Sequence, residues 1–140
     1  MTGCLPYASF DIQRASRNLD SSEQIFAGGP GSVRAYDNGV VSGTQGEWVT
    51  LEWRRALLGS WPGSWQGAIF LDGARVDVAK TVYGSGSNTA SLYGSGLSLN
   101  WTGSTGWSMT SSLATPLGNT PVLAGRRDSV RAWLALQKAF

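Results

Sequence analysis

The chain alternates apolar and polar residues with a period of two in six stretches of about ten residues each. This pattern is typical of β-strands with one apolar and one polar face, and the length is what a tilted strand needs to cross a bilayer. The predicted strands are Leu5–Arg17, Glu47–Leu57, Trp65–Asp77, Ala90–Thr102, Gly106–Leu117 and Ser129–Phe140.

Each stretch separates its two kinds of residue by strand parity. In the second stretch, Val49 and Leu51 share one face, and Glu52 lies on the other. In the third stretch, Phe70 and Asp72 share the polar face, so the stretch carries a carboxylate in its middle. The sequence therefore predicts an antiparallel sheet with one oily side and one polar side.

The segments between the strands alternate between long and short. Long segments span Asn18–Gly46, Val78–Thr89 and Gly118–Asp128, whereas Leu58–Ser64 and Gly103–Thr105 are compact turns. Bacterial outer-membrane barrels have tight turns at one end and long loops at the other, and a soluble sandwich has no reason to sort its loops in this way. We expect an all-β chain that is part of an antiparallel transmembrane β-barrel, in a single domain covering residues 1–140.

Composition supports this expectation. Only 14% of the residues are charged, against roughly 25% in ordinary soluble domains, and the chain contains 19 Gly and 7 Trp. No apolar run reaches the roughly 18 residues that a membrane-spanning helix needs, so only strands could cross a bilayer. Six tryptophans fall at or near predicted strand ends, where indole rings favour the membrane interface: Trp48, Trp53, Trp61, Trp65, Trp101 and Trp107.

Several functional classes are disfavoured. The net charge of +2 is too small to argue for nucleic acid. The chain has no His and a single Cys4, which disfavours zinc sites and Ser-His-Asp catalysis, so we expect neither an enzyme nor a cofactor. The N-terminus has no basic segment followed by an apolar core, although an outer-membrane protein requires a secretion signal. We therefore expect the chain to be a piece of a longer protein.

Two motifs resemble those of one family. The run Leu19–Tyr36, LDSSEQIFAGGPGSVRAY, closely resembles the signature of two-partner secretion transporters, also called hemolysin secretion/activation proteins. In that family, an L-D-S-S-E-Q run and a Gly pair precede a Val-Arg-Gly-Tyr loop tip, which corresponds here to Val33, Arg34, Ala35 and Tyr36. A second family motif, Phe-x-Asp-x-Gly on a barrel strand, resembles Phe70, Asp72 and Gly73, although here the Gly follows the Asp directly.

The resemblance implies that the loop of about residues 18–46 folds back into the barrel with Arg34 at its tip. Asp72 lies on the polar face, and a lone carboxylate in a partly dehydrated interior costs several kcal/mol unless a cation meets it. A guanidinium can bind a carboxylate through two parallel hydrogen bonds, which Lys cannot do. We therefore expect Arg34 to pair with Asp72; the alternative is a solvated Arg34 and an isolated strand charge.

Three further features bear on this resemblance. Ala35 replaces the family's Gly, so a positive φ at that position would cost roughly 1 kcal/mol or more. Glu52 and Arg54 resemble the family's Glu-Leu-Arg pattern and are expected to be secondary charges inside the barrel, or else plain solvated residues. Phe140 resembles the terminal aromatic that outer-membrane proteins present to the barrel assembly machinery.

By this resemblance, the complete protein exports a large β-rich exoprotein, a hemolysin or an adhesin, across the bacterial outer membrane. The expected partners are that exoprotein, the lipid of the outer membrane and the assembly machinery. This chain would be the C-terminal part of the barrel, without the periplasmic recruiting domains, and would not transport alone. Two alternatives stay open: an outer-membrane insertase of the same superfamily, and a soluble β-sandwich that binds carbohydrate.

Overall fold

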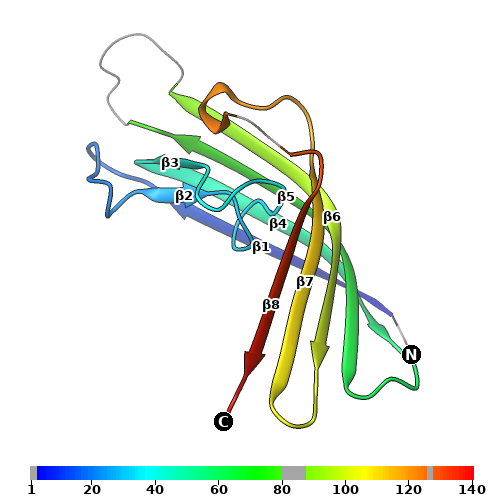
Figure 1. Ribbon diagram of the computed structural model, residues 1–140. Coiled ribbons are helices and arrows are strands. Elements are labelled where there is room, and N and C mark those ends of the chain that lie inside the picture. The colour runs from blue at the N-terminus through cyan, green and yellow to red at the C-terminus, as the bar shows by residue number, and fades with distance from the viewer. Residues whose placement is uncertain (1–2, 80–87, 126–127) are drawn as a thin grey trace.

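The computed structural model describes residues 3–79, 88–125 and 128–140, and it is all-β. Six strands form one antiparallel sheet in the order β1-β4-β5-β6-β7-β8, and two short strands form a separate hairpin (Figure 1). The sheet strands are β1 (Cys4–Gln13), β4 (Gln45–Leu57), β5 (Ser64–Asp77), β6 (Thr89–Thr102), β7 (Trp107–Pro116) and β8 (Arg131–Lys138). The hairpin is β2 (Ile25–Ala27) with β3 (Val41–Gly43), and η1 (Val122–Ala124) is a short 3-10 helix.

The six strands of the sheet correspond one to one with the six predicted strands. The largest difference is at β1, which was expected to reach Arg17 but ends at Gln13. The Gln13 side-chain amide donates hydrogen bonds to the Glu23 and Thr44 carbonyls, and this directs the chain away from β4 and into the loop. The start of β8 is also two residues later than predicted, at Arg131.

The two faces of the sheet differ as the alternation predicts. One face carries exposed apolar side chains and is called the outer face: Phe10, Ile12, Val49, Leu51, Trp53, Ile69, Leu71, Tyr93, Leu97, Leu113, Leu134 and Leu136. The opposite, inner face carries Glu52, Asp72, Ser98 and Ser112, all of them buried. Many of the large apolar side chains of this chain are thus exposed on the outer face and are not buried in its core.

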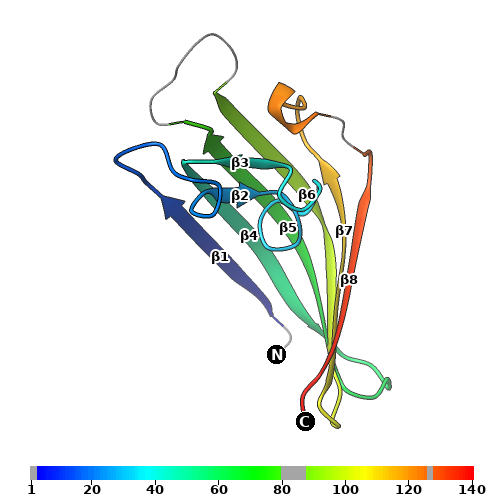
Figure 2. The same ribbon diagram turned by 60° about the vertical axis from the view of Figure 1, so that its left-hand side comes forward.

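The sheet is strongly curved, and its two ends differ (Figure 2). The compact turns after β4 and β6 lie at one end with the start of β1 and the end of β8, and the described parts of the longer connections lie at the other end. Parts of two predicted long loops, residues 80–87 and 126–127, lie outside the described residues. Within the described part of the chain, the sheet is not closed into a barrel, and β1 and β8 form its two edges.

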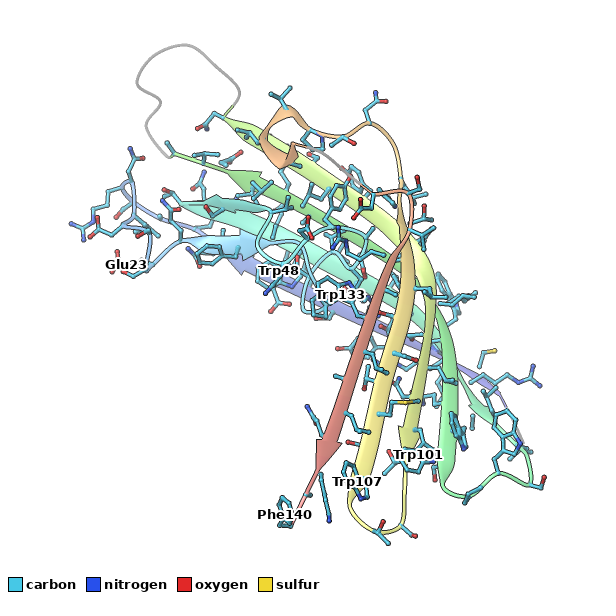
Figure 3. The ribbon with its side chains drawn as sticks, viewed as in Figure 1. Glu23, Trp48, Trp101, Trp107, Trp133 and Phe140 are labelled. Atoms are coloured by element: carbon cyan, nitrogen blue, oxygen red, sulfur yellow. The ribbon has the colours of Figure 1, made fainter. Side chains whose placement is uncertain are left out.

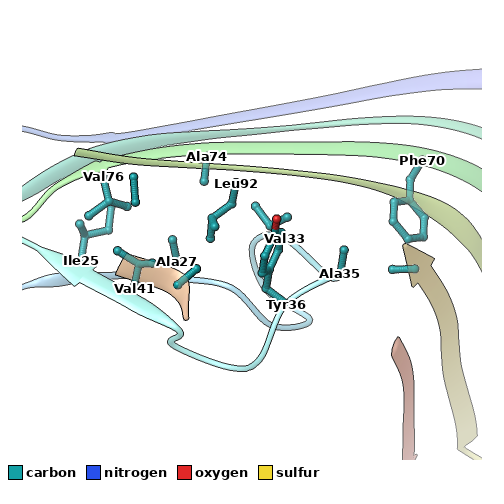
Figure 4. Packing of buried hydrophobic residues seen from close by; sticks show 13 residues of the cluster. Ile25, Ala27, Val33, Ala35, Tyr36, Val41, Phe70, Ala74, Val76 and Leu92 are labelled. Atoms are coloured by element: carbon teal, nitrogen blue, oxygen red, sulfur yellow. The ribbon is translucent and has the colours of Figure 1, made fainter. Parts of the chain in front are cut away.

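The loop between β1 and β4 lies across the inner face and forms the core with it (Figure 4). From the loop come Ile25, Ala27, Val33, Ala35, Tyr36 and Val41, and from the sheet come Phe70, Ala74, Val76, Ala90, Leu92 and Ala114. The sequence predicts a Gly-rich loop that is fixed at its tip and contains no strands. The loop instead contains the β2–β3 hairpin and is buried along much of its length.

The tryptophans follow the expected distribution only in part. Trp61, Trp65 and Trp101 gather at the short-turn end, where the indole N–H groups of Trp65 and Trp101 both donate to the Pro62 carbonyl. Trp48 was expected at an interface, but it lies on the inner face and packs against the core (Figure 3). Trp48 is four residues from Glu52 in the same strand, so its side chain lies on the same face as Glu52. Its environment is set by this alternation and not by its position near a strand end.

Among the described residues, no helix is long and apolar enough to cross a membrane.

Two glycines of β6 leave room for their neighbours on the inner face: Gly94 lets the loop approach the sheet, and Gly96 makes space for the Phe70 ring of the adjacent strand. A Cβ built on Gly94 would lie 2.6 Å from the Ala35 Cβ, and one built on Gly96 would lie 2.7 Å from the Phe70 ring. The φ of Ala35 is not positive, so replacing the family's Gly at this position carries no backbone penalty. The methyl group of Ala35 fits because the facing strand carries no side chain at Gly94.

We predict that Gly94→Ala lowers the free energy of unfolding by about 1–3 kcal/mol, because the added methyl group overlaps the Ala35 Cβ. Adding Ala35→Gly should recover most of the loss. Gly31→Ala is the control, since a Cβ on Gly31 meets nothing within 4 Å. The measurement is denaturant unfolding of the chain in detergent; a loss in Gly94→Ala that Ala35→Gly does not relieve would contradict the contact.

Candidate functional site: a buried arginine between two strands

Arg34 lies at the tip of the loop and binds Asp72 of β5 in the manner expected from the sequence. Its Nε donates to Asp72 Oδ2 at 2.9 Å, and its Nη2 donates to Asp72 Oδ1 at 2.8 Å. The backbone N–H of Arg34 also donates to Oδ2, at 3.1 Å. The Asp72 side chain is fully buried. The contact is therefore a two-pronged ion pair that also holds the loop backbone.

The Asp72 carboxylate has no acceptor capacity to spare. Besides the three hydrogen bonds from Arg34, the Thr50 hydroxyl donates to Asp72 Oδ1 at 3.1 Å. An ionised carboxylate offers about four acceptor positions, and all four are used. Burying the carboxylate is tolerable for this reason, since each lone pair that leaves water gains a donor.

Glu52 of β4 is a second direct partner of Arg34. Arg34 Nη1 donates to Glu52 Oε1 at 2.8 Å, and Arg54 Nε donates to Glu52 Oε2 at 2.6 Å. Glu52 and Arg54 were predicted only as secondary charges, and Glu52 is in fact buried and essential to the geometry. The four side chains carry two positive and two negative charges, so the cluster is neutral as a whole.

Aromatic rings support both arginines. The Arg34 guanidinium carbon lies 3.4 Å from the centre of the Phe70 ring, and the Arg54 guanidinium carbon lies 3.8 Å from the centre of the Tyr7 ring. A guanidinium that stacks on a ring gains a cation–π interaction and is shielded from water on that face. Phe70 of the strand motif thus contacts the same arginine as Asp72, because both residues lie on the inner face of β5.

The strand register explains why these residues meet. Thr50 pairs with Asp72, and Glu52 pairs with Phe70, so two neighbouring rungs of the β4–β5 ladder present four side chains to the same side. The loop then needs to bring only Arg34 to this place. A positive φ at Gly28 and Gly29 allows the loop to turn beside the tip.

Burial lowers the pKa of the Arg34 guanidinium, but the hydrogen bonds and charges of Asp72 and Glu52 outweigh this effect and raise the pKa above its ordinary value. Arg34 therefore stays cationic, and no change of pH within the physiological range releases the loop by neutralising it.

Other residues of the predicted motifs have different roles. Val33, Ala35 and Tyr36 are buried in the core beside Arg34, where they fix the tip by packing. Gly73 lies on the outer face between Val49 and Tyr93, so it is not part of the charged cluster. A Cβ at Gly73 would lie 3.2 Å from the Tyr93 ring, which gives the glycine a packing role.

Phe140 lies at the end of the chain and its side chain is fully exposed. The Lys138 ammonium lies 5.0 Å from the Phe140 ring and 5.3 Å from the Trp107 ring. Figure 3 shows Trp107 and Phe140 close to each other at the short-turn end. The structure thus places Phe140 far from the charged cluster.

The contacts between β8 and the loop were not predicted from the sequence. The Trp133 indole N–H donates to the Arg34 carbonyl at 2.8 Å, and Arg131 forms ion pairs with Asp37 of the loop and with Asp128. A signal was present in the alternation, because Arg131 and Trp133 occupy the polar face of the last strand. Their partner could not be identified, because it lies about a hundred residues away in the chain.

Two hollows flank the loop tip on the inner face. One lies between the tip, β1 and β4, and Tyr7, Asp11 and Thr50 contribute to its lining. The other has a volume of about 250 Å³ and lies between the tip and strands β6 to β8. Among the described residues, no group of three or more potential metal ligands gathers. The site is thus a structural charge cluster with a hollow on either side.

We predict that Arg34→Lys lowers the free energy of unfolding by about 2 kcal/mol, because an ammonium cannot replace the two-pronged hydrogen bonds to Asp72. Asp72→Asn should cost about 3 kcal/mol, since it leaves the buried Arg34 with one carboxylate. Exchanging the two charges should not restore stability, because a carboxylate at position 34 would face Glu52.

The control is Arg14→Lys, which changes an exposed ion pair with Glu47 and should cost below about 0.5 kcal/mol. Denaturant unfolding in detergent measures all four variants. Equal losses for Arg34→Lys and Arg14→Lys would show that burial of the Arg34 pair is not what stabilises the loop.

No protein-family model, curated protein or solved structure matches the chain. The functional inference therefore rests on the geometry of this site and on the motifs that compose it.

Proposed function

We propose that this chain is part of an outer-membrane transporter of the two-partner secretion type, which exports a large β-rich exoprotein through a β-barrel. The observation that carries the proposal is the pairing of Arg34, in a loop that resembles the family's loop motif, with Asp72, in a strand that resembles the family's strand motif. The two motifs are 38 residues apart in the chain and meet inside one charged cluster.

The outer face has the chemistry and the height of a surface in lipid. Along β6, the distance from Tyr93 to Trp101 is about 27 Å at about 3.4 Å per residue. A strand tilt of about 40° reduces this to about 20 Å across the bilayer, near the apolar band of about 25 Å of outer-membrane barrels. Aromatic residues lie at both limits, with Phe10 and Tyr93 at one and Trp65 and Trp101 at the other.

The chemistry of the inner face is compatible with the passage of a polar substrate, because uncharged polar groups lie there beside a charge cluster that is neutral as a whole. A soluble sandwich would cover one face with a second sheet and leave the other polar. Here the polar face is covered by the chain's own loop, and the apolar face is exposed. This arrangement favours a lipid-facing sheet over a carbohydrate-binding sandwich.

The Leu19–Gln24 run separates the transporter from an insertase of the same superfamily, which shares the loop but not this run. In this chain the run forms a compact turn: Glu23 N–H donates to the Asp20 carbonyl, and the Gln24 amide donates to the Leu19 carbonyl. The Leu19 N–H donates to the Thr44 hydroxyl. The run therefore links the two ends of the loop through the Leu19–Thr44 hydrogen bond. This is consistent with a loop that must keep a defined shape.

In the proposed setting, the lipid of the bacterial outer membrane covers the outer face, and further strands of the same barrel cover the edges of β1 and β8. The exposed Phe140 is then available to the assembly machinery. The activity needs no cofactor, because the cluster acts by holding the loop.

The function is tested in the native protein by comparing cells that carry the wild type with cells that carry Asp72→Asn. We expect a large β-rich protein to disappear from the culture medium and to accumulate in the periplasm in the variant. Arg14→Lys should export normally. Normal export by Asp72→Asn, or recovery of the wild-type chain as a detergent-free soluble monomer, would contradict the proposal.

A second prediction concerns the lipid contact. Leu113→Arg places a charge at mid-height on the outer face and should lower stability in a bilayer by about 2–4 kcal/mol. Ser108→Arg, on the inner face of the same strand, should have a much smaller effect. Unfolding titrations in lipid vesicles measure both, and equal effects on the two faces would argue against lipid at the outer face.

A further inference from the structure

Arg34 contacts two separate walls of the curved sheet. Its guanidinium and its backbone N–H bind Asp72 of β5, whereas its backbone carbonyl accepts a hydrogen bond from Trp133 of β8. In the sheet, β6 and β7 lie between these two strands. The loop tip therefore spans the inner face from one wall to the other, and Figure 3 shows Trp133 lying at the loop.

The two attachments differ in kind. On the β4–β5 side, the Arg34 guanidinium donates ionic hydrogen bonds to the buried carboxylates of Asp72 and Glu52. On the β8 side, the contacts are one neutral hydrogen bond and the Arg131–Asp37 pair, in which the Asp37 side chain is 60% exposed. Exposed pairs and neutral hydrogen bonds contribute less than buried ionic ones. The attachment to β8 is therefore the weaker of the two.

The space beside this weaker attachment is already open. The hollow of about 250 Å³ lies between Arg34 and Pro30 of the loop and Trp133 of β8. Its lining includes the uncharged polar residues Ser98, Asn100, Thr110 and Ser112 of β6 and β7, together with Glu52 and Arg54 of the charged cluster. Uncharged hydroxyl and amide groups can both donate hydrogen bonds to peptide carbonyls and accept them from peptide N–H groups. They can therefore bind the backbone of a polypeptide whatever its side chains are.

We propose that Trp133 and Arg131 form a gate between the loop tip and β8, and that the exported polypeptide passes through it in extended form along Ser98, Asn100, Thr110 and Ser112. This proposal rests on the proposed function, and it adds the route of the substrate and the residues that position the gate. When the gate opens, the contacts of Trp133 and Arg131 with the loop break, whereas the Arg34–Asp72 ion pair is kept. The buried charges therefore stay buried while the loop tip and β8 separate.

The gate is tested first by hydrogen exchange of the native protein in detergent. Trp133→Phe removes the indole N–H and keeps a ring, so we expect the loop-tip amides to exchange about fivefold faster, as the loss of one neutral hydrogen bond would give. The amides of β5 and β6 should be unchanged. Trp101→Phe is the matched control, because the Trp101 indole N–H also donates to a backbone carbonyl, that of Pro62 at 2.9 Å.

The second measurement is ion conductance of the same proteins in planar lipid bilayers. Trp133→Phe and Arg131→Gln should raise the open fraction severalfold, while Trp101→Phe should not. Faster loop exchange without any change in conductance would overturn the gate but leave the loop contact in place. Unchanged loop exchange in Trp133→Phe would overturn the β8 attachment itself.

The two proposals fail in different ways. A wild-type protein that forms no pore would remove the transporter function, and with it the gate, whereas the exchange measurement would still report whether β8 holds the loop. A pore in which Ser112→Trp leaves export and conductance unchanged would show that the polypeptide does not follow the β6–β7 wall.

Discussion

The burial of one guanidinium between two carboxylates constrains the rest of this structure. Arg34 can leave water only where Asp72 and Glu52 meet it together, and these residues share one face only when β4 and β5 pair in the observed register. Once the tip is in place, the loop behind it covers the inner face and supplies half of the core. The position of the core thus follows from an electrostatic requirement at the loop tip.

Much of the sheet could be predicted from the sequence because strand parity is a local property. The alternation around Phe70 and Asp72 gives the face on which each residue lies without any knowledge of distant contacts. The Arg34–Asp72 contact was also expected, since a carboxylate on an enclosed face requires a cation and the motif offered Arg34. The length of each strand was predicted less well where side chains such as Gln13 end the pairing.

The remainder could not be predicted because it depends on where the loop lies on the sheet. The hairpin, the direct role of Glu52 and the attachment to Trp133 all require the three-dimensional path of residues 14–44. A local signal did exist: Ala74, Val76, Ala90 and Leu92 make the inner face apolar at one end, which a purely water-facing wall has no reason to be. Such an interruption indicates that another part of the chain covers those positions.

The order of these parts along the chain has a consequence for biogenesis. Arg34 is synthesised before every strand that binds it. It can therefore form its observed contacts only after β4 and β5 have paired and β8 has joined the sheet. A slip of one residue in β5 would turn Asp72 outward and leave the arginine without its counter-ion. The loop can therefore reach its observed position only when β4, β5 and β8 are correctly aligned.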